Sequence, residues 1–455
     1  MMAGEKRPRS SSKDKTSVDE ITKDDEAAHP CLEFLAAGPR AFSVVESETR
    51  GTTLVANRDL PPHSLLVRLP TKFLVTYEAV CATALSKVIG EVVSTTSEDD
   101  DDSTSTSTII MSPEELTWLN MVYWLASSEM TSHQVYLKSL SKVPPNLSAW
   151  SQSLRDELIG SNVYAVLDES GNGDNVDGNV RVVHTLLVKL DRIRNVLKEN
   201  TTMTEDSVVC GILLEASESS IFTTTSISWA RGHFLSRRFP ALLDKFRNTT
   251  VETTNHLAGY GNATSMFVPV LDLMNHTPVK ANACTIEITP DYLQVSTGDT
   301  DLAKGDELFY CYAEGGQSNE VLLQGYGFCL PNNPADTVSV KICGTSETPA
   351  FFSIGRGGAN AIPNEMWRAM AGMSTLPTED ENIEIGSGDL ELLVQYMTTK
   401  LTQLLNNSSS KTSNNTTTDE SNTDKERLSF IEMYKSGQRE ILEALIQDLS
   451  SMLEG

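Results

Sequence analysis

The order of β-type and helical segments is the feature that most constrains the fold of this chain. Short runs of β-branched and aromatic residues occur over about residues 31–90 and again over about 260–345. Between them, about residues 110–259 carry apolar side chains at helical spacing. Two consecutive domains would not normally place strands on both sides of a long helical stretch. The pattern therefore predicts an α+β fold in which a helical insertion interrupts one β-domain over residues 31–345.

Segments poor in apolar residues flank or interrupt these regions. Residues 1–30 are polar and charged, and they predict a disordered tail. Flexible inserts are predicted at 94–108, which contains an Asp/Ser/Thr run, and at 170–179, which is rich in Gly, Asn and Asp. The remainder, 346–455, reads as a mainly helical domain with an Asn/Ser/Thr tract at 406–423. We expect its last helix to pack one apolar face.

Local patterns also predict individual elements. Strands are predicted at Ala41–Val45, Thr52–Ala56, Ser64–Leu69, Met266–Leu271 and Leu308–Tyr312, and a hairpin at Cys284–Val295. Ser112-Pro113-Glu114-Glu115 is typical of a helix N-terminus, because Ser112 can accept from first-turn amides and Glu115 completes a capping box.

Composition limits the classes of function. The 455 residues include 62 acidic and 36 basic side chains, a formal charge of −26. This charge repels phosphate backbones, so we expect no nucleic-acid partner, and among protein substrates it favours a basic or neutral segment over an acidic one. No apolar run has the roughly 18 residues of a membrane-spanning helix, and the N-terminus lacks the apolar stretch of a secretory signal. We therefore expect a location in the cytoplasm or the nucleus and no membrane partner. We also expect a monomer.

The seven cysteines are scattered along the chain. They include no C-x-x-C and no close Cys/His pairing of the kind that binds zinc. Neither a metal site nor a disulfide framework is therefore expected.

Three segments of the second β region carry side chains suited to a binding site. Asn275-His276 follows an apolar run and offers an amide and an imidazole where the backbone leaves a strand. In the strand ending at Tyr312, alternation places Tyr312 on the same face as Leu308 and Tyr310. The third segment, Ser318–Phe328, follows closely. Taken singly, each is also compatible with a buried polar group or a core tyrosine that serves only the fold.

In combination, these segments resemble the SET-domain protein methyltransferases, in the branch typified by the Rubisco large-subunit lysine methyltransferase and the actin-histidine methyltransferase. In that branch an Asn-His pair is followed by a hairpin, a Gly-Asp/Glu-Glu-aliphatic strand ending in Tyr, a Ser-Asn pair and a Gly-Phe element. The same order occurs here at Asn275-His276, Gly305-Asp306-Glu307-Leu308, Tyr312, Ser318-Asn319 and Gly327-Phe328. The resemblance is specific over about residues 31–345 and looser beyond.

Other parts of the chain are similar to the same branch. Arg50-Gly51-Thr52-Thr53 looks like the opening turn of the family, although Thr53 stands where the family has its second glycine. Tyr136–Leu140 and Ser236–Phe239 look like parts of the helical insertion of the branch. Residues 432–442 are similar to its substrate-binding helical domain.

The resemblance implies S-adenosylmethionine as cofactor and in-line transfer of its methyl group to a nucleophilic nitrogen. It implies a catalytic role for Tyr312. It implies cofactor binding by Arg50, Gly51, Thr52, Arg237, Asn275 and His276, and substrate binding by Arg237, Asp272, Tyr312 and Tyr326. A solvated arginine at a helix end is the alternative interpretation of Arg237.

The resemblance also bears on the target residue. In the actin-histidine relative a Trp precedes the Asp of the Asn-His segment and an Arg precedes Ser-Asn, whereas this chain has Leu271 and Gln317. The prediction is therefore a protein-lysine N-methyltransferase, and the missing cysteine clusters of many histone-directed enzymes favour a non-histone substrate. The alternatives are a protein-histidine N-methyltransferase and a non-catalytic SET-fold protein-binding module, for which Thr53 leaves room. The loop Ala313–Gln317 also looks one residue longer than usual.

Overall fold

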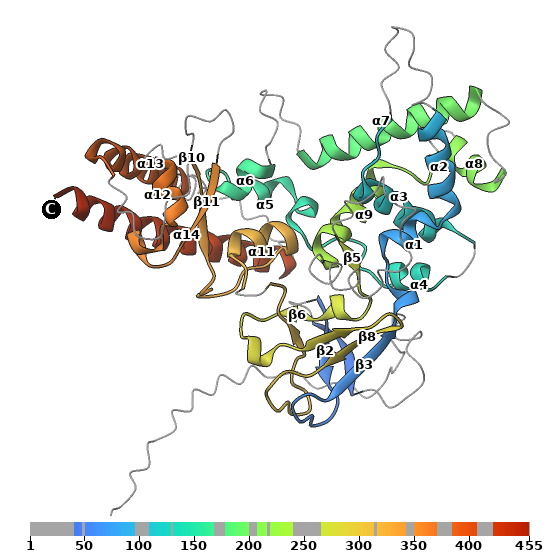
Figure 1. The fold of residues 1–455 in the computed structure, drawn as a ribbon, viewed down its shortest axis with the longest axis horizontal. Coiled ribbons are helices and arrows are strands. Elements are labelled where there is room, and N and C mark those ends of the chain that lie inside the picture. Colours follow the sequence, from blue (N-terminus) through green and yellow to red (C-terminus); the bar gives the residue numbers. More distant parts are fainter. Residues whose placement is uncertain are drawn as a thin grey trace, which may run out of the picture.

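The computed structural model describes most of the 455-residue chain. The described ranges are 41–47, 51–95, 109–128, 131–167, 178–199, 207–215, 219–239, 265–313, 316–342, 350–370, 385–406 and 422–454. The predicted tail at 1–30 lies outside them, as do most of the predicted inserts at 94–108 and 170–179 and most of the tract at 406–423. In Figure 1 the strands of residues 42–70 and 275–310 gather below a group of helices, and the C-terminal helices lie to the left together with the strands of residues 337–355.

Strands from the two β regions join in one sheet. β1 (Phe42–Ser47) and β2 (Gly51–Ala56) form an antiparallel hairpin. β3 (Leu65–Pro70) pairs antiparallel with β8 (Tyr292–Ser296), and β8 pairs antiparallel with β7 (Thr285–Ile288). The sheet order β3-β8-β7 therefore unites the two β regions that the helices separate along the chain. This confirms the predicted α+β fold with its helical insertion, and it confirms the predicted hairpin.

Two short strands bring the Asn-His pair beside the segment that leads to Tyr312. β6 (Asn275–His276) pairs in parallel with β9 (Phe309–Tyr310). The strand predicted at Leu308–Tyr312 is thus too long at both ends. Leu308 donates its amide to Leu54 of β2 at 2.8 Å, and the amide of Tyr312 donates to the His276 imidazole rather than to a neighbouring strand.

The strand predicted at Met266–Leu271 is wrong beyond its second residue. β5 (Met266–Phe267) pairs with β4 (Arg238–Phe239), and the chain then enters a 3₁₀-helix, η4 (Leu271–Leu273). Val270 precedes this helix with φ of 76°, a left-handed value that β-branched residues rarely adopt. That backbone conformation ends the extended run and places Asp272 inside η4.

The helical insertion lies between β3 and β5. It contains η2 (Thr71–Phe73), α1 (Tyr77–Cys81), α2 (Ala84–Thr95), α3 (Pro113–Ala126), α4 (Ser132–Lys138), η3 (Leu147–Ala149), α5 (Gln152–Asp156), α6 (Asn162–Leu167), α7 (Gly178–Glu199), α8 (Ser207–Leu214) and α9 (Thr224–Arg237). α3 begins with the predicted capping box: the Ser112 hydroxyl accepts from the Glu115 amide at 3.1 Å, and the Glu115 carboxylate accepts from the Ser112 amide at 2.8 Å. α9 packs between α3 and α7, and its Phe234 shares one core with Phe267 of β5.

Two short helices follow strands of the second β region. After β6 the chain forms η5 (Lys280–Asn282), and after β9 it forms α11 (Asn319–Tyr326).

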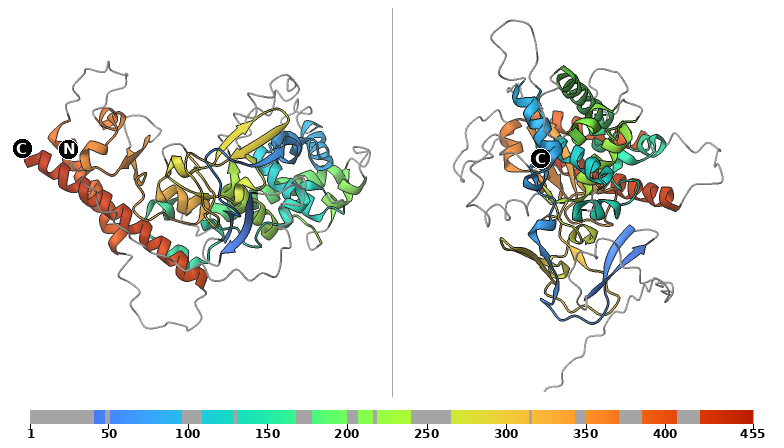
Figure 2. Two further views of the ribbon diagram at one scale, coloured as in Figure 1. Left: turned by 90° about the horizontal axis from the view of Figure 1, so that it is seen from below. Right: turned by 90° about the vertical axis from the view of Figure 1, so that its right-hand side faces the viewer.

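The C-terminal region is helical, as expected, apart from one hairpin. The C-terminal elements are β10 (Thr337–Ile342), β11 (Ala350–Gly355), η6 (Gly358–Ala361), α12 (Asn364–Met370), α13 (Ser387–Asn406) and α14 (Asn422–Glu454). The hairpin β10–β11 was not predicted. It forms a second core with α12, α13 and α14, and Figure 2 shows α14 running along this side of the molecule.

The long helices α7, α13 and α14 are amphipathic rather than uniformly apolar. Within the described ranges, no helix combines the length and the apolar character that crossing a lipid bilayer requires.

Candidate active site

A glutamate joins the first hairpin to the Asn-His strand. One carboxylate oxygen of Glu307, Oε1, accepts from the Thr53 hydroxyl and from the Asn275 side-chain amide, each at 2.7 Å. The backbones of the same two segments are also paired, because Val55 and Glu307 form an antiparallel bridge. Two stretches of chain that are far apart in sequence, one around Thr53 and one around Asn275, therefore meet at Glu307.

The His276 ring is held in one tautomer. Its Nδ1 accepts from the backbone amide of Tyr312 at 3.1 Å, so in the neutral ring Nε2 carries the proton. Burial lowers the pKa of His276 below its ordinary value of 6.5, which keeps the ring neutral. Nε2 is buried and has no hydrogen-bond partner among the described residues. The ring thus offers a buried donor beside Tyr312.

Tyr312 lies at the centre of this junction. Its hydroxyl donates to the Met274 carbonyl at 2.9 Å. Its ring centroid lies 5.0 Å from that of His276 and 4.7 Å from that of Tyr326. Burial, and after it the neighbouring Tyr326, raise the pKa of Tyr312 above its ordinary value of 10.0, so the phenol stays protonated at neutral pH.

Further aromatic rings surround the Tyr312 phenol. The Tyr310 ring centroid lies 6.3 Å from that of Tyr312, and the Phe328 centroid lies 6.2 Å from that of Tyr326. Burial raises the pKa of Tyr310 to about 12. Tyr326 is the last residue of α11, and Gly327 ends that helix with φ of 77°, a conformation that favours glycine. The result is a cluster of aromatic rings around Tyr312.

A buried ion pair supports the other side of Met274. Arg237 Nη1 donates to the Asp272 carboxylate at 3.0 Å and to the Asp272 carbonyl at 3.1 Å, and the Tyr136 hydroxyl donates to the same carboxylate oxygen at 2.8 Å. The side chains of Asp272 and Arg237 are 0% and 15% exposed. The other carboxylate oxygen of Asp272, Oδ1, is buried without a hydrogen-bond partner in the described part of the chain.

The two charges of this pair stabilise each other. Burial raises the pKa of Asp272, and the adjacent Arg237 charge opposes that rise. Burial is the largest single influence and would by itself lower the pKa of Arg237. The charge and hydrogen bond of Asp272, together with Tyr136 and Tyr312, outweigh it and leave that pKa raised. Arg237 is therefore an anchored, charged side chain rather than a solvated one at a helix end.

The predicted site residues fall into a connected group, with one exception. Asn275, His276, Tyr312 and Tyr326 lie together, and Arg237 and Asp272 are joined to them through Met274 and the backbone of η4. Gly51 and Thr52 begin β2, the strand that contains Thr53. Arg50 lies outside the described residues.

Two further site residues were not predicted. Glu307 connects Thr53 with Asn275, and Tyr136 holds Asp272. Both lie inside segments whose resemblance to the SET-domain branch was recognised, so the motif was the available signal. Thr53, which replaces a family glycine, pairs with Val45 in a regular antiparallel hairpin and does not need a left-handed backbone.

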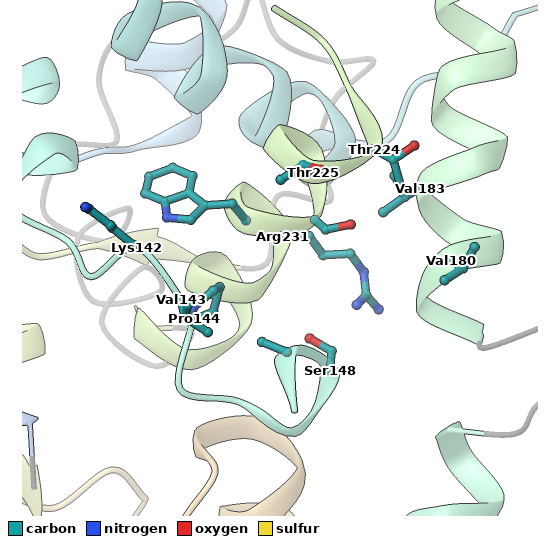
Figure 3. A pocket seen from close by; sticks show the side chains of 12 residues that line it. Lys142, Val143, Pro144, Ser148, Val180, Val183, Thr224, Thr225 and Arg231 are labelled. Atoms are coloured by element: carbon teal, nitrogen blue, oxygen red, sulfur yellow. The ribbon is translucent and has the colours of Figure 1, made fainter. Parts of the chain in front are cut away.

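A cavity of about 370 Å³ opens elsewhere, within the helical insertion. Trp229 of α9 is among its lining residues, and Figure 3 shows the Arg231 side chain of α9 between Ser148 and Val180 of α7. None of the predicted site residues lines it. We place the candidate site at Tyr312 because the buried donor, the phenol and the ion pair converge there.

Comparison with known proteins finds relatives that match part of the chain. No protein-family model matches the chain. It is 31% identical over 129 residues to the ribosomal lysine N-methyltransferase set10 of Schizosaccharomyces pombe, an alignment that covers 28% of this chain and 21% of the relative. It is 28% identical over 139 residues to the N-lysine methyltransferase setd6 of Danio rerio, covering 30% of this chain and 29% of that protein. The chain thus spans less than a third of the length of each of these relatives.

Solved structures share the fold along most of the chain. The SET domain of LSMT bound to lysine and AdoHcy superposes with a TM-score of 0.62 at 16% identity, covering 92% of this chain and 89% of that one. Rubisco LSMT bound to AdoMet gives a TM-score of 0.57 at 16% identity, covering 93% and 90%. The chain thus has the fold of the Rubisco LSMT structures along nearly its whole length, and parts of it are similar in sequence to two lysine methyltransferases.

Proposed function

We propose that this chain is a protein-lysine N-methyltransferase that uses S-adenosylmethionine as its methyl donor. The observation that carries the proposal is the half-buried Tyr312 phenol, which lies beside the neutral His276 ring and the Tyr326 ring. The names of two relatives, both lysine methyltransferases, support the same reaction.

The cofactor would bind on the side of the site formed by β2 and β6. His276 Nε2 offers a buried donor without a partner among the described residues, which fits a ligand with hydrogen-bonding edges. Asn275 is fixed beside it by Glu307. We assign cofactor binding to these two residues, to Gly51 and Thr52 at the start of β2, to Arg237, and to Arg50. When bound, S-adenosylmethionine supplies an electrophilic methyl group on a positively charged sulfur.

The aromatic side of the site would receive the substrate lysine. A lysine ammonium has an ordinary pKa of about 10.4 and cannot act as a nucleophile until it loses its proton. An apolar surface, such as the one formed by Tyr312 and Tyr326, disfavours the charged form and lowers that pKa. Because the Tyr312 proton is donated to Met274, the phenolic oxygen keeps lone pairs that can orient the lysine amine.

The anchored ion pair would bind substrate beside this surface. Asp272 Oδ1 is buried and has no partner among the described residues, so a donor from the substrate would satisfy it. Arg237 is held against Asp272 and carries a positive charge. The main contribution of the protein is alignment of the two reactants, which can account for a large part of a transfer rate.

The residues at two positions favour lysine over histidine as the target. Leu271, which precedes Asp272, is buried, and Gln317 precedes Ser318-Asn319; the actin-histidine methyltransferase has Trp and Arg at these places. A non-histone protein remains the proposed substrate, in the cytoplasm or the nucleus. Histidine methylation and a non-catalytic binding role are the alternatives that the test must separate.

The test is transfer of a labelled methyl group. The full chain is incubated with tritiated S-adenosylmethionine and lysate proteins, and labelled peptides are analysed by mass spectrometry. The proposal predicts ε-N-methyllysine. Methylhistidine would instead establish a protein-histidine N-methyltransferase, and calorimetric binding of S-adenosylmethionine without any transfer would establish a non-catalytic binding module.

A further inference from the structure

A buried carboxyl group lies outside the candidate site, between α11 and β10. Asp336 is 0% exposed. Its Oδ1 accepts from the backbone amides of Asn319 at 2.9 Å and Thr337 at 3.2 Å. Oδ2 is buried and has no hydrogen-bond partner among the described residues. Burying a carboxyl group is unfavourable, and the two hydrogen bonds from backbone amides offset part of that cost.

Asn319, which Asp336 holds, in turn closes a loop around α11. Its side chain donates to the Leu330 carbonyl at 3.0 Å and accepts from the Leu330 amide at 2.9 Å. The Asn333 side chain adds a bond to Asn319 at 3.2 Å and one to the Gln317 carbonyl at 2.7 Å. These bonds tie the start of α11 to the segment that follows its end. Tyr326, whose ring faces Tyr312, lies between Asn319 and Leu330, the two residues that these bonds hold together.

The last helix is seated directly on this carboxyl group. Gly437 of α14 faces Asp336, and a methyl group at position 437 would collide with Oδ2. The next residue, Gln438, is buried and donates to the Thr337 carbonyl at 2.8 Å. Because the α14 backbone at Gly437 approaches the Asp336 carboxylate so closely, a movement of α14 toward Asp336 would displace that carboxylate and strain its two backbone bonds.

Both C-terminal helices also reach α11 at other points. Lys400 of α13 donates to the Asn162 side chain at 2.5 Å, and Asn162 donates to Glu320 in the first turn of α11 at 3.1 Å. Leu323 of α11 shares a core with Ile431 and Tyr434 of α14. α11 therefore contacts α14 directly and is linked to α13 through Asn162, and it also packs against η3, α6 and α9.

From these contacts we infer that Asp336 and Gly437 are positioning residues through which the C-terminal helices set the position of Tyr326 against Tyr312. The inference rests on the proposed function, because it makes the substrate side of the methyl-transfer site depend on α14. The cofactor side is held separately, by the bonds of Thr53 and Asn275 to Glu307. A disturbance at Gly437 should therefore affect methyl transfer and leave cofactor affinity unchanged.

The main test introduces a methyl group beneath α14. In Gly437→Ala, the initial rate of methyl transfer to lysate proteins at saturating S-adenosylmethionine should fall about tenfold, because small misplacements of aligned groups reduce rates steeply. The S-adenosylmethionine concentration for half-maximal rate should not change. Hydrogen exchange should become faster at the amides of α11 and not at those of α9. Gly388→Ala is the matched control, since its added methyl group meets nothing within 4 Å.

A double variant tests whether the two residues act through each other. Asp336→Ala removes the group with which the new methyl would collide, so Asp336→Ala/Gly437→Ala should be no slower than Asp336→Ala alone. Asp336→Asn keeps an acceptor for the two amides and should retain wild-type exchange at α11, whereas Asp336→Ala should not. The comparison of Asp336→Asn with Asp336→Ala tests the inference if Gly437→Ala does not fold.

Hydrogen exchange also keeps this inference distinguishable from the proposed function. If the wild type transfers no methyl group, the exchange of α11 in these variants still reports the coupling. Wild-type exchange and rate in folded Gly437→Ala would overturn the inference, as would additive losses in the double variant or equal behaviour of Asp336→Asn and Asp336→Ala.

Discussion

Acid should loosen α9 through His233, which is fully buried in that helix. Its Nε2 lies 2.9 Å from the Ser141 carbonyl, and its ring centroid lies 4.7 Å from that of Trp229. Burial, and after it the charge of Arg237, lower the pKa of His233 from 6.5 to about 3. The folded protein therefore keeps this ring neutral at pH values at which the unfolded chain protonates it.

The sign and size of the effect follow from proton binding. Below pH 6.5 the unfolded state binds a proton that the folded state does not, so stability falls as the pH falls. Each pH unit in this window is worth about 1.4 kcal/mol. Between pH 6.5 and pH 4, His233 should therefore remove about 3 kcal/mol of the free energy of unfolding.

The assay is urea denaturation at a series of pH values, comparing the wild type with His233→Gln. Glutamine does not titrate and can still donate to the Ser141 carbonyl. Other groups titrate in both proteins, so the difference between the two curves isolates His233. The wild type should lose about 3 kcal/mol more than the variant between pH 6.5 and pH 4. Parallel curves would refute a buried, neutral His233.

Three substitutions test other parts of the account. Both Gly327 and Gly305 have left-handed backbones, with φ of 77° and 92°, but only at Gly327 would an added methyl group collide, with the Pro145 carbonyl. Gly327→Ala should therefore lower the melting temperature more than Gly305→Ala, and equal losses would contradict the packing. Ser112→Ala removes the capping box of α3 and should lower the free energy of unfolding by about 1 kcal/mol in urea, where no change would count against it. Glu307→Ala leaves Thr53 and Asn275 without their acceptor, so calorimetry should show weaker S-adenosylmethionine binding; unchanged affinity would separate Glu307 from the cofactor site.

Local sequence patterns predicted the elements whose formation depends on local chemistry. The α3 capping box and the hairpin of β7 and β8 formed as expected, because their turn and cap residues act within a few positions. The order of the motifs was sufficient to indicate the SET-domain fold. The apolar face of α14 is likewise buried at Ile431, Tyr434, Ile441, Leu442 and Leu445.

Features that depend on distant partners were not predictable in this way. The amide of Tyr312 bonds the imidazole of His276 instead of continuing a strand, and only the folded chain brings these groups together. The apolar run Met266–Leu271 likewise gives no indication that the backbone of Val270 is left-handed. β11 was missed because its short segment is ordered by pairing with β10. Glu307 acquires its role from a residue in the other β region, Thr53.

The central claim is that the Tyr312 hydroxyl acts at the methyl-transfer centre. Its most direct test is the initial rate of methyl transfer in Tyr312→Phe at saturating S-adenosylmethionine, with calorimetric binding of the cofactor measured on the same preparation. The ring still fills its space beside Tyr326, so binding should persist while the rate falls by about 100-fold. A rate equal to that of the wild type would contradict the account.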